Sequence, residues 1–427
     1  MAVRLHSSTG TRWKASRLGQ RLVSPELSAG LSLPVVVVGI GGGLIGAAYL
    51  AALHLVTELI GPGSRPDAHQ AVIMVAVGTA VALLTRLLGP SGNVELLVDN
   101  IHVLGGTEDT RMVRSVIPTS LLCVGAGGAM GPEAPLVQAN GTFGSWVAEK
   151  FNLDRTDVRI LTITGMAAGF SVLFGAPLGA ALFALEILHR RGLQYYEALV
   201  PAVIGALAGH AVYFAASGLG LRPVWELPPV GSLGGADLAW GAACGVVGGV
   251  GALLFGWMVA VSKRATAGIP SPALPIVAGA ALGALAWWSP FALTNGEFQV
   301  EEIVGGGLTA AALGVAILAK LAGVLVTLTG QWKGGFIIPL FFIGFAGGQL
   351  IGELVPSVNV TVVMVGLAVA LCVGVTKTPL GSTLVVTQMA GMALAPTALI
   401  AATIALIITN RDAVIESQRS RVELGAA

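Results

Sequence analysis

Long apolar runs recur along this chain from residue 31 to residue 408, and they decide which solvent the fold must suit. Hydrophobic residues make up 55% of the sequence and charged residues only 11%, whereas soluble domains carry roughly 25% charged residues. The mean hydropathy is +0.84. The chain is therefore predicted to be an all-α integral membrane protein, whose apolar runs are its membrane helices.

Several of these runs are too short for a simple crossing. The runs at 274–288 and 360–375 fall below the ~20 residues that a straight transmembrane helix needs. The chain also contains 60 glycines and 21 prolines, many of them inside the runs. Most such glycines serve close helix packing. Broken backbone at membrane depth, however, survives only beside protein or a water-filled cavity, so the breaks also indicate a pathway.

Charge placement predicts the topology and excludes several functions. The formal net charge is only +1, so nucleic acid is not an expected partner. The residues before position 30 carry basic side chains against a single acid, Glu26: Arg4, Arg12, Lys14, Arg17 and Arg21. By the positive-inside rule, residues 1–30 form a basic cytoplasmic arm of a plasma-membrane protein. The three cysteines lie in apolar runs, and no His or Cys spacing indicates a metal or other cofactor.

The chain repeats itself at a nearly constant interval. Gly131-Pro-Glu-Ala-Pro135 matches Gly335-Phe-Ile-Ile-Pro339 at an offset of 204 residues, and Gly92 falls opposite Gly296 at the same offset. The segments 177–182 and 379–384 match at an offset of 202. A shared offset indicates duplication. We therefore expect a first membrane repeat at 31–216, a linker at 217–236, a second repeat at 237–410 and a cytoplasmic helix or tail at 411–427.

The matched breaks predict an anion site. A helix N-terminus presents unpaired N–H groups and a positive dipole end, which stabilise an anion without a cationic side chain. Glu133 lies in one break, and an ionised carboxylate at membrane depth must face protein or water. It can occupy the ion's place and leave when protonated, which makes it a gate and a possible proton carrier. The alternative is a structural Glu133 bound to helix-end amides.

At these residues the sequence resembles the CLC family of chloride channels and chloride/proton antiporters. The resemblance rests on "GPEAPLVQANGTFG", "FGAPLGAALFALE" and "WKGGFIIPLFFIG", at 131–144, 174–186 and 332–344, and it covers about residues 31 to 420. It implies an inverted-repeat fold of about 18 tilted and partial helices. It also implies a homodimer with one pore in each subunit.

The resemblance also assigns roles to single residues. Glu133 takes the place of the family's external gating glutamate, and Ser91 with Gly92 falls where the family has its central ion-binding serine. The anion-binding backbone would come from a set of residues at the breaks: Gly131, Ala134, Gly335, Phe336, Ile337 and Ile338. Three positions depart from the family pattern. Pro132 replaces a basic residue and removes one N–H donor, Ile187 replaces the internal proton-transfer glutamate, and Ile415 replaces the central tyrosine.

These residues imply an anion channel or transporter, with chloride as the expected ion. Because the internal glutamate is absent, passive conduction is favoured; a proton-coupled chloride or fluoride antiporter is the alternative, and "KGG" followed by "PLFFIG" is similar to the family's fluoride/proton branch. An intramembrane enzyme would need a nucleophile and base or a metal cluster near Glu133, and the runs offer neither. We therefore expect no enzymatic activity. A membrane scaffold that transports nothing would not need matched helix breaks.

Overall fold

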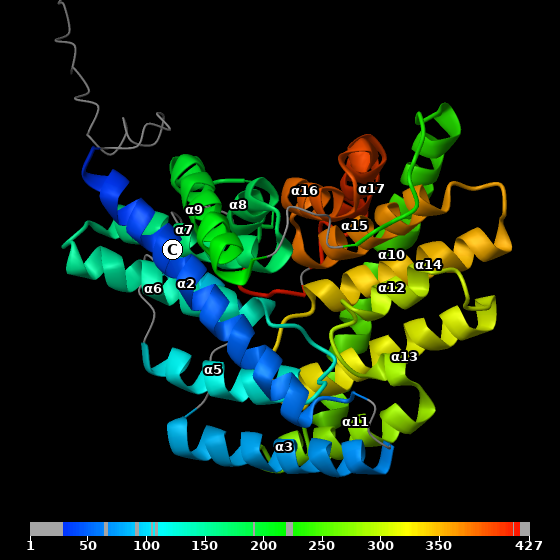
Figure 1. Cartoon of the computed structure of the whole chain (residues 1–427), viewed down its shortest axis with the longest axis horizontal. Coiled ribbons are helices and arrows are strands. Elements are labelled where there is room, and N and C mark those ends of the chain that lie inside the picture. The colour runs from blue at the N-terminus through cyan, green and yellow to red at the C-terminus, as the bar shows by residue number, and fades with distance from the viewer. Residues whose placement is uncertain are drawn as a thin grey trace, which may run out of the picture.

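Helices form the whole ordered framework that the structure describes (Figure 1). The computed structural model describes residues 29–63, 67–89, 94–103, 106, 110–190, 193–218, 225–412 and 414–418. Within these ranges the only β-type pairing is an isolated antiparallel bridge between Gly131 and Gly335. The prediction of an all-α membrane protein is confirmed. The predicted arm at 1–30 and the end of the predicted tail lie almost wholly outside the described residues.

The first half of the chain begins with a long helix and continues through shorter ones. Its elements are α2 (Ala29–Ile60), α3 (Asp67–Leu88), α4 (Val94–Val103), α5 (Thr110–Gly125), α6 (Glu133–Lys150), α7 (Arg155–Phe174), α8 (Pro177–Glu186), the 3₁₀ helix η1 (Tyr196–Ala198) and α9 (Leu199–Ser217).

The second half follows the same order. Its elements are α10 (Gly235–Thr266), α11 (Leu274–Trp288), the 3₁₀ helix η2 (Pro290–Ala292), α12 (Gln299–Val304), α13 (Ala310–Thr329), α14 (Ile337–Leu354), α15 (Val360–Thr376), α16 (Pro379–Ala390), the 3₁₀ helix η3 (Met392–Leu394) and α17 (Ala395–Ile408). Helices α6 and α14 begin 204 residues apart, and α8 and α16 begin 202 apart. These are the offsets at which the sequence repeats, so the chain is built as two repeats.

Helix length varies far more than a simple bundle would require. Seven helices in the described ranges are long and apolar enough to cross a membrane. Helices α2 and α10 have 32 residues each, about 48 Å, which exceeds the ~30 Å hydrocarbon core and requires tilt. Helix α8 has 10 residues, about 15 Å, and ends partway. The predicted mixture of tilted and partial helices is therefore present.

Local sequence explains where the partial helices begin. Pro177 and Pro379 occupy the first positions of α8 and α16, where the missing N–H would have no partner in the helix anyway. Each proline follows a helix that ends in a left-handed residue, Gly175 with φ 61° after α7 and Lys377 with φ 63° after α15. A lysine rarely adopts this conformation. Its ammonium group offsets the cost by donating to the carbonyl oxygens of Gly374 and Thr409, at 2.6 and 2.7 Å.

The two halves share one hydrophobic core. The largest buried cluster combines Phe170, Phe174 and Phe183 from α7 and α8 with Phe341 from α14, and the rings of Phe174 and Phe341 lie 6.4 Å apart. In Figure 1 the halves occupy opposite sides of the molecule, with α3 and α11 packed together along one edge. Cys123, Cys244 and Cys372 are free and buried, as their apolar surroundings predicted.

Lys320 is a fully buried cation inside α13. Its ammonium group donates to the carbonyl oxygens of Leu293 and Thr294 and to Oε1 of Gln299, at 2.7, 2.8 and 2.8 Å. It also lies 4.8 Å from the ring centroid of Phe342. Leu293 and Thr294 precede Gly296, the counterpart of Gly92, so this lysine fixes the break between η2 and α12.

Replacing Lys320 with methionine is expected to lower the free energy of unfolding by about 1–3 kcal/mol for each buried acceptor left without a donor. Methionine keeps the length of the side chain but cannot satisfy the three oxygens. Thermal unfolding of the detergent-solubilised protein measures the loss. Lys263→Met, at an exposed position near the end of α10, is the matched control. Equal unfolding temperatures for the two variants would contradict the bracing role.

Candidate functional site

Two glycines join the break before α6 to the break before α14. The Gly131 N–H donates to the Gly335 carbonyl oxygen at 2.7 Å, and the Gly335 N–H donates to the Gly131 oxygen at 2.6 Å. A Cβ atom on Gly335 would lie 2.6 Å from Oε2 of Glu133, and one on Gly131 would also overlap that carboxylate. Both positions therefore require glycine for the carboxylate to lie where it does. The structure thus places two predicted site residues, 204 positions apart, in direct contact.

Glu133 is the first residue of α6 and is 0% exposed. Its Oε1 atom accepts a hydrogen bond of 2.7 Å from the backbone N–H of Ile338, in the first turn of α14. The carboxylate therefore lies at the positive end of a helix from the other half of the chain. Its Oε2 atom has no hydrogen-bond partner among the described residues. One oxygen is tethered and the other is available for a proton.

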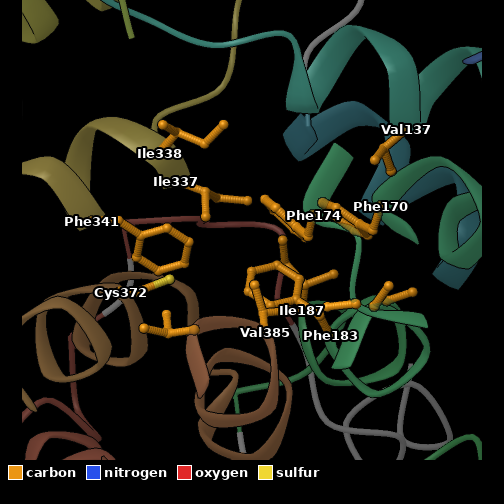
Figure 2. Close-up of a cluster of buried hydrophobic side chains, with 14 of the residues drawn as sticks. Val137, Phe170, Phe174, Phe183, Ile187, Ile337, Ile338, Phe341, Cys372 and Val385 are labelled. Carbon is orange, nitrogen blue, oxygen red and sulfur yellow. The ribbon is translucent and has the colours of Figure 1, made fainter. Parts of the chain in front are cut away.

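A small cavity of about 20 Å³, enough for about one water molecule, lies beside this carboxylate. Its walls are almost wholly apolar, and they come from both halves of the chain: Leu97, Ala134, Val137, Met166, Phe170, Ile187, Gly335, Phe336 and Ile337. Figure 2 shows side chains of α6, α7, α8 and α14 converging at this place. The cavity therefore brings together four of the predicted anion-binding residues, Ala134, Gly335, Phe336 and Ile337, and one predicted departure, Ile187.

The remaining predicted residues lie in three different settings. Pro132 precedes α6 as its N-cap residue and is buried. Ile415 is 2% exposed and belongs to the largest hydrophobic cluster, so its position holds an apolar side chain packed into the protein. Ser91 and Gly92 lie outside the described residues, and their assignment to the central ion site stays a prediction.

Ile187 is held at the cavity by the C-terminal segment of the chain. The Gln418 side-chain amide donates to the carbonyl oxygens of Ile187 and Thr376, at 2.9 and 2.7 Å. One side chain therefore ties the end of α8 to the end of α15 beside the cavity. Sequence reasoning did not single out Gln418, because an amide 231 residues from its partner carries no local signal.

Glu186 forms a second contact between a carboxylate and a helix end. It is 1% exposed, and its two oxygens accept from Gly381 N–H at 2.8 Å and Leu380 N–H at 3.3 Å, in the first turn of α16. A second hydrogen bond joins the same two helices: Oε1 of Gln388 in α16 accepts from the N–H of Gly179 in α8 at 3.3 Å. Both oxygens of Glu186 are satisfied, whereas Glu133 has one satisfied oxygen. Glu186 therefore caps the start of α16 with both oxygens, and Glu133 caps the start of α14 with one.

Two repeats of spanning and partial helices, with helix N-termini from both halves meeting at a buried carboxylate, define a membrane protein suited to pass anions. Comparison with known proteins agrees with this class. The family model described as voltage gated chloride channel matches residues 78–410. The chain belongs to this family, and it is an anion-transport protein of the CLC type.

Individual relatives show how far the similarity extends. The chain is 29% identical over 406 residues to a protein named chloride/fluoride channel protein from Pseudomonas syringae pv. tomato, covering 87% of this chain and 86% of the relative. It is 25% identical over 346 residues to a putative ion-transport protein of Escherichia coli, covering 77% and 80% of the two chains.

Solved structures share the fold. A slow cyanobacterial Cl⁻/H⁺ antiporter superposes with a TM-score of 0.77 at 18% identity, over 94% of this chain and 98% of the other. A CLC-type fluoride/proton antiporter gives a TM-score of 0.75 at 20% identity, over 91% and 98%. The membrane fold implied by the sequence resemblance is confirmed by these likenesses.

Proposed function

We propose that this protein conducts chloride passively through a pathway gated by Glu133. The observation that carries the proposal is the position of the Glu133 carboxylate. Its Oε1 atom accepts a hydrogen bond from Ile338 N–H at the N-terminus of α14, beside the cavity. An anion would be stabilised by the same helix end. While Glu133 is ionised, it competes with the ion for this place. Protonation removes its charge, weakens its hold on the N–H group and allows the ion to enter.

The anion path would be formed mainly by backbone. Ala134, Phe336 and Ile337 line the cavity, and their N–H groups lie at or beside the starts of α6 and α14. Gly335 also lines the cavity, but its N–H donates to the Gly131 oxygen, so it contributes space and not a donor. Ile338 supplies the N–H group that Glu133 occupies. We assign Gly131 the role of holding the two helix starts together and Ser91 with Gly92 the role of a central ion site.

Ile187 is the basis for favouring passive conduction. It lines the cavity at the position where antiporters resembling this chain carry a proton-transfer glutamate, and an aliphatic side chain binds no proton. The Pseudomonas relative is named a channel protein. Both superposed structures, however, are described as proton antiporters, one of chloride and one of fluoride. Proton-coupled antiport of either ion, with Glu133 as the proton carrier, is therefore the second candidate.

The location and assembly follow the same reasoning. We propose a plasma-membrane protein of two identical subunits, each with repeats at 31–216 and 237–410, and with the N-terminus in the cytoplasm. It has the role of a transport protein and not of an enzyme. Its transported partners are chloride or other small anions, with protons if the transport is coupled.

Simultaneous recording of chloride and protons tests the proposal. The purified protein is reconstituted in liposomes loaded with chloride, and anion efflux and external pH are followed together with no proton gradient imposed. Passive conduction requires valinomycin with potassium for efflux and moves no protons. Proton uptake in fixed ratio to chloride release, persisting against an opposing gradient, would replace the channel by the antiporter. Release of fluoride with little chloride would change the assigned ion.

A further inference from the structure

Lys320 is a buried cation whose hydrogen-bond partners are all neutral. Its ammonium group contacts the carbonyl oxygens of Leu293 and Thr294 and Oε1 of Gln299, at 2.7, 2.8 and 2.8 Å. Charged residues inside a membrane protein are costly, and they usually pair with an opposite charge or mark an ion pathway. Among the described residues, no carboxylate forms an ion pair with Lys320. That part of the chain therefore holds no counter-charge for it.

The hydrogen bonds show that the side chain is charged. Carbonyl oxygens can only accept, so Leu293 and Thr294 each take one hydrogen from the lysine nitrogen. The Gln299 amide donates from Nε2 to the Pro290 carbonyl oxygen at 3.1 Å, which leaves Oε1 facing Lys320. Three acceptors around one nitrogen require three hydrogens. Only the ammonium form carries them.

The first half of the chain holds the equivalent break without a charge. Gly89 corresponds to Leu293 at the repeat offset of 204 residues. Its carbonyl oxygen accepts from Oγ of Ser115 on α5, at 3.0 Å. At the same offset, Lys320 corresponds to Val116, the next residue on α5. A neutral hydroxyl is therefore enough to hold this oxygen, and the positive charge in the second half needs another explanation.

The charge lies close to the start of α14. The ammonium group is 4.8 Å from the ring centroid of Phe342, which lies four residues after Ile338 on that helix, about 6 Å along its axis. Thr294, one of the acceptors, donates its own N–H to the Gly127 carbonyl oxygen at 2.8 Å, in the segment that connects α5 to α6. The ammonium group therefore lies on the order of 10 Å from the Ile338 N–H group.

An ammonium group at this distance acts on an ion without touching it. Two unit charges ~10 Å apart, at an effective dielectric constant of about 20, change each other's binding equilibrium by roughly tenfold. Salt screens surface charges, but it screens buried ones much less. Helix N-termini supply only partial positive charges. The full charge on Lys320 therefore adds to the attraction that the helix ends exert on an anion.

We propose that Lys320 is the buried counter-charge of the transported anion, and that it sets the affinity of the pathway for chloride. The inference rests on the proposed function, because it takes the anion to bind at the start of α14. Lys320 acts through its field, while Leu293, Thr294 and Gln299 hold the ammonium group in place. Neutral partners suit this role, since a carboxylate beside the ammonium group would cancel its field.

Chloride binding at equilibrium tests the inference on the full-length protein. Isothermal titration calorimetry in detergent gives the dissociation constant, and thermal unfolding in gluconate, without chloride, gives the stability of the same samples. Lys320→Met removes both the charge and the brace, so it is expected to weaken chloride binding about tenfold and to lower the unfolding temperature. Lys263→Met, at an exposed position near the end of α10, removes a surface charge and should change neither.

Two substitutions of Gln299 separate the charge from the brace. Gln299→Glu keeps an acceptor for the ammonium group but places a negative charge beside it, so chloride binding should weaken about tenfold while the unfolding temperature is kept. Gln299→Met removes the acceptor and leaves the positive charge, so the unfolding temperature should fall while the dissociation constant stays the same. If Lys320→Met does not fold, these two variants decide alone.

An unchanged dissociation constant in a folded Gln299→Glu protein would overturn the proposal. A dissociation constant that follows the unfolding temperature across the variants would also overturn it, because Lys320 would then be a brace only, and so would undetectable chloride binding in the wild type. Chloride efflux from liposomes tests the proposed function separately. If binding weakens as expected but the wild type passes no chloride, the conducting role fails and the counter-charge stands.

Discussion

Replacing Glu133 with glutamine is expected to give chloride efflux that no longer changes between about pH 5 and about pH 8. Glutamine keeps an oxygen that can accept from Ile338 N–H, but it carries no charge and titrates in none of this range. In the wild type, the protonated fraction of a carboxyl group falls about tenfold for each pH unit above its pKa. Wild-type efflux should therefore rise as pH falls, and the variant should hold the high value throughout.

The measurement is chloride efflux from liposomes of matched internal and external pH, with valinomycin and potassium present. Glu58→Gln is the control, because Glu58 is exposed on α2 and pairs with His54 at the surface. It should leave the wild-type profile intact. A Glu133→Gln protein with the wild-type pH profile would remove Glu133 from the gate, and the helix-capping interpretation of this residue would then stand alone.

The breaks that build this site could be read from the sequence because their signals are local. Glycine and proline mark where a helix begins, and duplication marks them a second time at a fixed offset, as at Gly131 and Gly335. Position relative to the break then predicted that Glu133 lies at a helix end. The hydrogen bond from Ile338, 205 residues away, was not predictable, because it depends on how the two halves pack.

The contact between His102 and Tyr195 shows the limit of sequence reasoning. The histidines are scattered along the chain without metal-ligand spacing, and the contact between His102 and Tyr195 joins residues 93 positions apart. Lys320 is similar, because its acceptors at Leu293 and Thr294 belong to a different element. Such contacts arise only when α4 meets the end of α8, or when α13 meets η2. A polar residue in an apolar run predicts that a partner exists but does not name it.

The pairing of Glu133 with α14 and of Glu186 with α16 explains how one arrangement can support two roles. In both cases a carboxylate from the first half accepts from backbone N–H groups at a helix start in the second half. Glu186 uses both oxygens, so moving it would leave two buried donors unsatisfied, at about 1–3 kcal/mol each. Glu133 uses one oxygen beside a cavity, so in the proposed function its departure would leave one donor, which an entering anion would satisfy. On that proposal, the number of hydrogen bonds separates Glu186 as a helix cap from Glu133 as the gate.

Gly131→Ala is expected to raise chloride efflux at neutral pH and to flatten its pH dependence toward that of Glu133→Gln. The three atoms nearest to a Cβ at Gly131 all belong to the Glu133 carboxylate group. The φ angle of Gly131 is not left-handed, so alanine fits the backbone, and the new methyl group displaces a side chain that can move. Efflux at neutral pH is expected to rise about tenfold. This equals the effect of lowering the pH by one unit in the wild type, where the protonated fraction of the carboxyl group rises about tenfold.

Gly335→Ala is the comparison variant that shows whether displacement of the Glu133 carboxylate causes the effect of Gly131→Ala. A Cβ atom there would meet Oε2 of Glu133 at 2.6 Å, but also Cβ of Glu133 at 2.9 Å and the backbone nitrogen of Ala134 at 3.0 Å, which cannot swing away. This variant is expected to lose efflux, because the joined helix starts must separate. Adding Gly131→Ala to Glu133→Ala should change nothing further, since the displaced group is already absent. If Gly131→Ala instead lowers efflux in both backgrounds, the glycine serves the backbone pairing alone, and the carboxylate does not hold the pathway closed.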